Sequence, residues 1–64
     1  MDKEYFYEMG KKEGIKLIEQ PKSYEEALII KTENIFEKYG KECAEAYRRG
    51  ILSILVPYKE IKAR

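Results

Sequence analysis

The segment PKSYEEALIIKTENIFEKYGKECAEAYRRGILSILVP, residues 21–57, decides the fold, because helix-ending residues divide it into two stretches of helical length. Proline lacks the backbone amide that a helix interior needs, and glycine readily adopts the left-handed conformation at which many helices end. Pro21, Gly40 and Pro57 therefore mark the boundaries of helices. Together with the residues before Pro21, the sequence predicts three helices, over residues 2–20, 23–39 and 41–56.

The second predicted helix has the clearest start. Ser23-Tyr24-Glu25-Glu26 is a capping box, in which the side chains of Ser23 and Glu26 each bond the other residue's free amide. The run Ala27-Leu28-Ile29-Ile30 alone has the composition of a strand, but the capped start and a helical period outweigh it. The apolar residues that form one helical stripe are Leu28, Ile29, Ile35, Phe36 and Tyr39. Gly40 supplies the left-handed residue after the helix.

The third predicted helix carries a continuous apolar seam. Its members follow one another at spacings of four, three, one, three and one residues, which keep them on one helix face. They are Cys43, Tyr47, Gly50, Ile51, Ile54 and Leu55. Pro57 is expected to break or kink this helix, since it lacks an amide and disfavours a helical conformation at Val56. We expect residues 57–64 to form a short helical turn or a frayed tail.

The first predicted helix contains two glycines four residues apart, Gly10 and Gly14. Each glycine costs about 1 kcal/mol relative to alanine in a helix interior, so some interaction should offset that cost. Glycines at this spacing let another helix approach the backbone closely, which is the preferred interpretation. A break at Gly10 and contact with a ligand remain as alternatives. Asp2 is placed to cap the helix at its start.

The length of the chain predicts self-association. A single domain of 64 residues, 1–64, buries only about 60% of the surface that its unfolded form exposes. One cysteine and no histidine exclude an internal disulfide and the common zinc sites, so a partner subunit remains as the source of stability. We expect an all-α fold in which a helical hairpin, residues 23–56, is crossed by the N-terminal helix and completed by homodimerisation. The expected interface residues are Phe6, Met9, Gly10, Gly14 and Leu17.

No catalytic constellation is recognisable, and we expect neither enzyme activity nor a cofactor or metal site. Cys43 lies near the start of the third predicted helix, where the helix dipole favours a thiolate, but no histidine is present to act as its base. Its expected role is that of a small buried apolar residue. The two glycines neither follow a strand nor precede Lys-Ser/Thr as in a phosphate-binding loop.

The charges are balanced, with 13 basic and 12 acidic residues. The only basic cluster consists of Arg48, Arg49, Lys59, Lys62 and Arg64. Three tyrosines near this cluster, Tyr39, Tyr47 and Tyr58, offer stacking faces, so weak nucleic-acid binding is the alternative function. A net charge of +1 is far from the strongly basic profile of dedicated nucleic-acid binders. We therefore expect a non-enzymatic helical interaction module that binds itself or a larger protein.

The sequence also predicts a cytoplasmic location. The first residues, Met-Asp-Lys-Glu-Tyr-Phe-Tyr, have no apolar run of the kind that a signal peptide contains. The longest apolar stretch, residues 51–56, is far shorter than the roughly 20 residues that cross a bilayer. Association with a membrane is therefore not expected.

Overall fold

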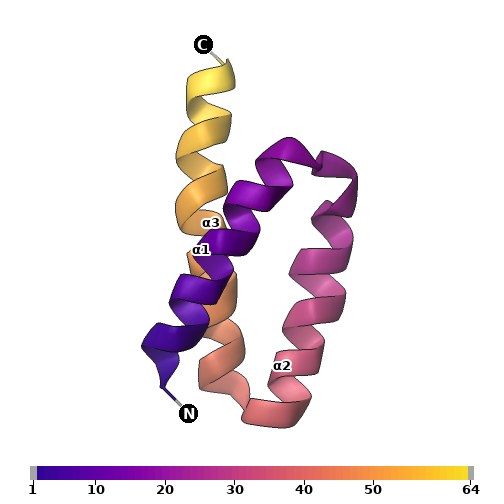
Figure 1. Ribbon diagram of the computed structural model, residues 1–64, viewed down its shortest axis with the longest axis vertical. Coiled ribbons are helices and arrows are strands. Elements are labelled where there is room, and N and C mark those ends of the chain that lie inside the picture. Colours follow the sequence, from indigo (N-terminus) through magenta and orange to yellow (C-terminus); the bar gives the residue numbers. More distant parts are fainter. Residues whose placement is uncertain (1, 64) are drawn as a thin grey trace.

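The computed structural model describes residues 2–63, and for Ser23, Lys62 and Ala63 it describes the backbone alone. The elements in chain order are α1 (Lys3–Glu19), the short 3-10 helix η1 (Pro21–Ser23), the π-helical segment η2 (Glu26–Lys31), α2 (Thr32–Tyr39) and α3 (Lys41–Ala63). The chain forms three helical arms that pack against one another (Figure 1), and we call η2 and α2, which come second in chain order, the middle arm. The expected all-α, three-helix fold is confirmed.

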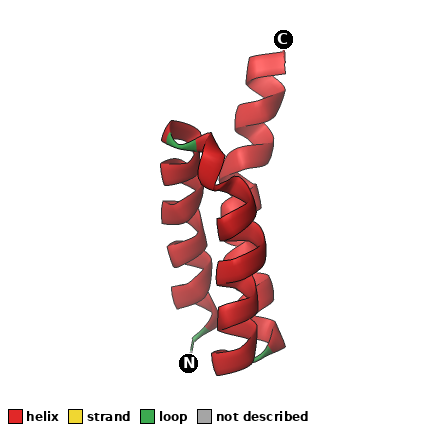
Figure 2. Cartoon of the chain, turned by 90° about the vertical axis from the view of Figure 1, so that its right-hand side faces the viewer, coloured by secondary structure: helices red, strands yellow, loops and turns green. Residues whose placement is uncertain are grey.

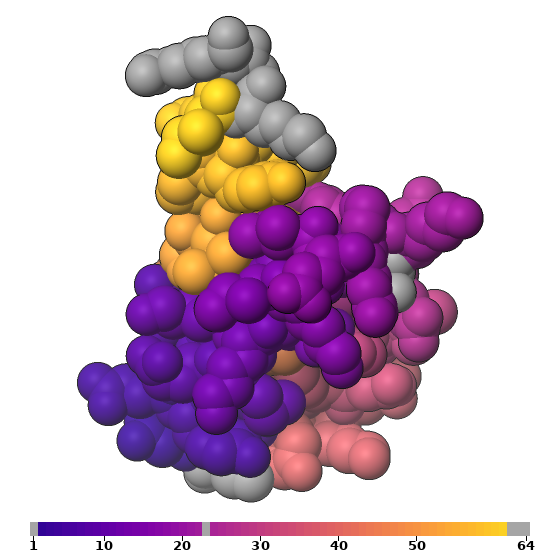
Figure 3. All heavy atoms as spheres, turned by 45° about the horizontal axis from the view of Figure 1, so that its top comes forward, coloured from indigo at the N-terminus to yellow at the C-terminus, as the bar shows by residue number. Residues whose placement is uncertain are grey.

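The α2–α3 hairpin is covered by α1 on one side only. Figure 2 shows α1, the helix that starts at the N-terminus, on one side of the two helices that follow it. The C-terminal end of α3 extends beyond the other two arms in Figure 1, and in Figure 3 this end stands clear of the surface that α1 forms. Within residues 2–63, no helix therefore lies over the other side of the hairpin.

The start and end of α1 follow from local hydrogen bonds. The Asp2 side chain accepts a bond of 3.0 Å from the amide of Glu4, and Glu4 itself lies favourably in the first turn. At the other end the Gln20 amide donates to the carbonyl of Lys16, and Pro21 follows. The predicted helix over residues 2–20 is confirmed to within one residue at each end.

Glycines allow the backbones of α1 and α3 to touch. A Cβ atom added at Gly10 would lie 2.1 Å from the carbonyl oxygen of Tyr47. One added at Gly50 would lie 2.1 Å from the carbonyl oxygen of Tyr7. Non-bonded heavy atoms are most stable about 3.5–4.0 Å apart, so no larger residue fits here without separating the helices.

Gly14 extends the same contact by one turn. A Cβ atom at Gly14 would lie 2.9 Å from the Cβ of Ile54. The close packing predicted for Gly10 and Gly14 is therefore confirmed. The alternative of a break at Gly10 is wrong, because α1 is continuous from Lys3 to Glu19.

The middle arm differs from its prediction in two ways. Its helical course begins at η1, and the capping box rests on the Ser23 side chain, which lies outside the described residues. Its first turns then form the π-helical segment η2. Ala27 is buried in η2, and Ile35 is buried in the α2 helix that follows. In a continuous α-helix, two residues eight apart would point about 80° apart. The wider π turns accommodate an extra residue and bring Ala27 and Ile35 towards one face.

This shift of register makes part of the predicted core stripe wrong. Ile35 is buried and Leu28 is partly buried, as the stripe required. The other three members, Ile29, Phe36 and Tyr39, are exposed. Large apolar side chains of the middle arm therefore face away from the core.

In α3 the predicted seam is confirmed, but the predicted end is wrong. Cys43, Tyr47, Ile51 and Leu55 are buried in the core. The helix then continues through Pro57 to Ala63. Proline leaves the carbonyl of the residue four positions earlier without an amide partner. Here that residue is Ser53. Both Pro57 and Ser53 are exposed, so water can bond the free carbonyl of Ser53.

Gly40 joins α2 to α3. Its φ of 98° lies in the region that glycine adopts readily, as the sequence predicted. Its amide donates to the carbonyl of Phe36, and its carbonyl accepts from the amide of Ala44. Gly40 alone thus ends α2 and starts α3, so the connection between the two helices is a single residue.

The core lies where the three arms meet. All of its buried apolar residues come from the two faces of α1 and α3 that touch and from the inner side of the middle arm. They are Phe6, Leu17, Ala27, Ile35, Cys43, Ala44, Tyr47, Ile51 and Leu55. Met9, Ile18, Tyr24, Leu28 and Ala46 pack against them.

Candidate functional site

The residues expected to bind a second chain lie inside this one. Phe6 is 1% exposed and Leu17 is 2% exposed. Gly10 and Gly14 are buried against α3, and Met9 packs on the core beside them. The structure brings the five residues together, but at the α1–α3 contact. Phe6, Leu17 and the two glycines are unavailable to another chain unless α1 leaves α3, so these residues do not provide a surface for association in the folded chain.

The structure describes the side chains of only three of the five basic residues expected to bind nucleic acid. Arg48, Arg49 and Lys59 are exposed on α3, and the Lys59 ammonium lies 4.4 Å from the centroid of the Tyr24 ring. The side chain of Lys62 and the whole of Arg64 lie outside the described part of the chain.

The aromatic faces that would stack on bases fit the nucleic-acid alternative poorly. Tyr47 is 2% exposed and belongs to the core, so its ring cannot stack on a base. The Tyr39 ring lies 5.0 Å from the Phe6 ring, centroid to centroid. No observation in the described residues favours nucleic acid as a ligand over protein.

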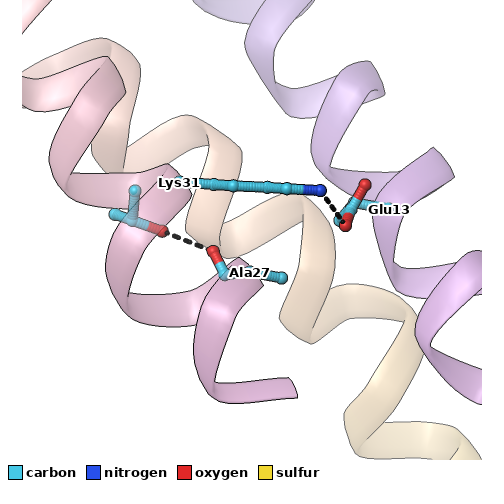
Figure 4. A network of polar contacts seen from close by, with 4 residues as sticks. Glu13, Ala27 and Lys31 are labelled. Carbon is cyan, nitrogen blue, oxygen red and sulfur yellow. Dashed lines mark hydrogen bonds and ion pairs between the residues drawn. The ribbon is translucent and has the colours of Figure 1, made fainter. Parts of the chain in front are cut away.

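A polar contact ties α1 to η2 (Figure 4). The Lys31 ammonium donates a 2.8 Å bond to Oε1 of Glu13, whose side chain is only 14% exposed. Nearby, the hydroxyl of Thr32 donates a 3.3 Å bond to the carbonyl of Ala27, five residues earlier in the π-helical segment. Because Glu13 is already paired with a cation, this cluster reads as a structural clamp that fixes how η2 sits on α1.

The same region affects a core tyrosine. Burial of the Tyr47 hydroxyl raises its pKa from 10.0 to about 12, and the negative charge of Glu13 adds to the effect. Both causes oppose formation of a tyrosinate in the folded chain. Tyr47 is therefore a neutral core residue at physiological pH and offers no base for catalysis.

The described residues hold no cluster of metal-ligating type. Within residues 2–63, no three side chains drawn from His, Cys, Asp and Glu come close enough to hold a metal ion. Cys43 is buried in the core, as the sequence predicted for a small apolar residue. Its burial keeps it from reacting with a substrate in solution.

The uncovered side of the hairpin carries an apolar groove of about 240 Å³ between α2 and the first half of α3. Phe36, which is 54% exposed, forms one wall, and Ala44, which is 4% exposed, forms the floor. The residues that line the groove are Thr32, Glu33, Phe36, Lys41, Ala44, Glu45 and Arg48. Phe36 is therefore an aromatic side chain that is largely exposed to water beside the groove.

The neighbouring turns extend this surface. Leu52 lies one turn beyond Arg48 on α3 and is half-buried, and Ile29 lies one turn before Glu33 and is more than half exposed. Leu52 follows Gly50 by two residues, which is about 200° around the helix, so it points away from α1. We call Ile29, Leu52 and the residues that line the groove the hairpin face.

Sequence reasoning missed the hairpin face because it assigned Ile29 and Phe36 to the core. Both residues belonged to the predicted buried stripe, but Ala27 and Ile35 take the buried side of the middle arm, and Ile29 and Phe36 are exposed. One signal was present in the sequence: six tyrosines and many aliphatic residues exceed what so short a chain can bury. That signal indicates an exposed apolar surface but does not locate it.

Comparisons with known proteins return no match, whether with family models, curated proteins or solved structures. No helix within residues 2–63 combines the length and the apolar character that crossing a bilayer requires.

Proposed function

We propose that the protein is a non-enzymatic helical interaction module of the cytoplasm, which associates with itself and in that form presents helices to larger protein partners. The observation that carries this proposal is the exposure of large apolar side chains outside the core. Ile29, Ile30 and Phe36 on the middle arm are each more than half exposed. Single exposed apolar residues are ordinary, but three large ones within eight residues of one arm, with Phe36 beside an apolar groove, offer the kind of surface that binds a partner.

The total exposed surface supports the same proposal. The chain exposes 4982 Å² for a mass of 7.6 kDa. Folded monomers of this mass typically expose about 4300 Å². The chain therefore leaves roughly 700 Å² more surface in water than a compact monomer of its mass, and the projecting end of α3 contributes to this excess.

Sedimentation equilibrium of the purified chain, from micromolar to millimolar concentration, tests the proposal. We expect the weight-average mass to rise from that of one chain towards that of two. A mass that stays at one chain over the whole range would overturn the proposed self-association. The same experiment in high salt shows how much of the association is electrostatic, since screening weakens pairs of exposed charges.

A further inference from the structure

We infer that the hairpin face binds the same face of a second copy, so that two α2–α3 hairpins form a four-helix bundle about a two-fold axis parallel to their helices. This inference rests on the proposed self-association and names its site and geometry. In such a dimer α1 lies on the outside of each hairpin, where it already covers the opposite side. Four-helix bundles built from two helical hairpins satisfy the usual packing rules for helices.

The apolar part of the face is shaped for an identical partner. Phe36 stands beside a groove whose floor is the small residue Ala44. A two-fold axis parallel to the helices places α2 of each copy over α3 of the other. Each Phe36 ring then lies over the partner's groove, and both rings leave water. Buried aromatic anchors of this kind supply much of the binding energy of protein interfaces.

The charges around the groove select the same arrangement. Its rim carries two carboxylates, Glu33 and Glu45, and two cations, Lys41 and Arg48, so it has no net charge. A neutral rim of alternating sign favours neither a basic nor an acidic peptide, but it is complementary to a second copy of itself.

The positions of these charged residues along the helix axes determine which of them face each other in the dimer. Glu33 on α2 lies seven residues before Gly40 and Arg48 on α3 lies eight residues after it, so the two groove residues lie at about the same height on antiparallel helices. With α2 of one copy over α3 of the other, each Glu33 faces an Arg48, and the contact occurs twice. Pairing α2 with α2 would instead gather exposed carboxylates of both copies, which costs free energy. The carboxylates concerned are those of Glu25, Glu26, Glu33 and Glu37.

Reversal of the two facing charges tests this geometry. Glu33→Arg and Arg48→Glu should each weaken dimerisation at least tenfold, because each puts two like charges opposite each other twice. An equimolar mixture of the two variants should dimerise as the unchanged chain does, since every contact in the mixed dimer again joins opposite charges. The chain with both substitutions should also dimerise by itself.

Matched controls come from α1. Glu19→Arg and Lys12→Glu make the same changes of charge at exposed positions away from the hairpin face, and they should leave dimerisation unchanged within twofold. Circular dichroism of every variant checks that the monomer remains folded.

The outcomes separate the two proposals. If the unchanged chain never dimerises, the proposed self-association is wrong and this inference falls with it. If the unchanged chain dimerises but single reversals have no more effect than the controls, or the mixture does not recover, a different face is used. In that case the inference is overturned while the proposed function stands.

Discussion

Replacing Gly10 or Gly50 by alanine should destabilise the fold, although both lie inside helices where alanine is the better helix former. An added methyl group would lie 2.1 Å from a backbone carbonyl oxygen at either position. An ordinary contact needs about 3.5 Å, so α1 and α3 would have to separate by more than about 1 Å. Overpacking of this kind typically costs about 1–3 kcal/mol, whereas the gain in helix propensity is at most about 1 kcal/mol.

The net effect should be a loss of about 1–2 kcal/mol for each variant, measured by urea unfolding followed by circular dichroism. For a domain of this size that loss lowers the melting temperature by about 4–16 °C. Gly14→Ala should cost less, because its methyl group would lie 2.9 Å from the nearest atom, a side-chain carbon of Ile54. Lys12→Ala, at an exposed position of the same helix, should stay within about 0.5 kcal/mol of the unchanged chain. If Gly10→Ala and Gly50→Ala stabilise the chain, as they would in a solvated helix, the close packing of α1 on α3 is refuted.

Three further predictions follow from the polar clamp, the buried tyrosine and the hairpin face. Lys31→Met removes the cation that pairs with the mostly buried Glu13, and it should lower the free energy of unfolding by about 1–3 kcal/mol in urea; an unchanged value would show that the pair is not structural. Because the folded-state pKa of Tyr47 is raised, its contribution to stability is complete below pH 10 and is lost as the pH rises towards 12. Unfolding by urea across this range should show a steeper loss for the unchanged chain than for Tyr47→Phe, and equal slopes would contradict the assignment. Phe36→Ala should weaken dimerisation at least tenfold in sedimentation equilibrium with little change in the stability of the monomer; an unaltered dimer would remove Phe36 from the interface.

The parts of the fold that depend on local sequence signals were predictable. The α3 seam follows from apolar residues at helical spacing, and the turn at Gly40 follows from the conformation that glycine adopts readily. The cap at Asp2 is of the same kind, because the hydrogen bond spans only two residues. In each case the residues that determine the structure are neighbours in sequence.

The remaining features depend on contacts between distant segments. The π-helical segment η2 allows Ala27 and Ile35 to share the buried side, and Lys31 of this segment reaches Glu13 of α1. No pattern of neighbouring residues predicts the π-helical register, and the sequence analysis therefore assigned Phe36 to the core, although it is exposed. Pro57 could remain in α3 because the end of that helix projects into solvent.

The candidate site shows the same limit most clearly. The spacing of Gly10 and Gly14 correctly indicates the close approach of another helix, but it does not say to which chain that helix belongs. Here the chain's own α3 fills the position, and for this reason we propose self-association through the uncovered hairpin rather than through α1.

The most direct measurement is the NMR spectrum of the isotope-labelled chain as it is concentrated from micromolar to millimolar. The backbone amides of Glu33, Phe36 and Arg48 should shift with concentration, while those of Gly10 and Gly14, enclosed within each monomer, should stay where they are. A spectrum that does not change, or changes that centre on the two glycines, would contradict association through the hairpin.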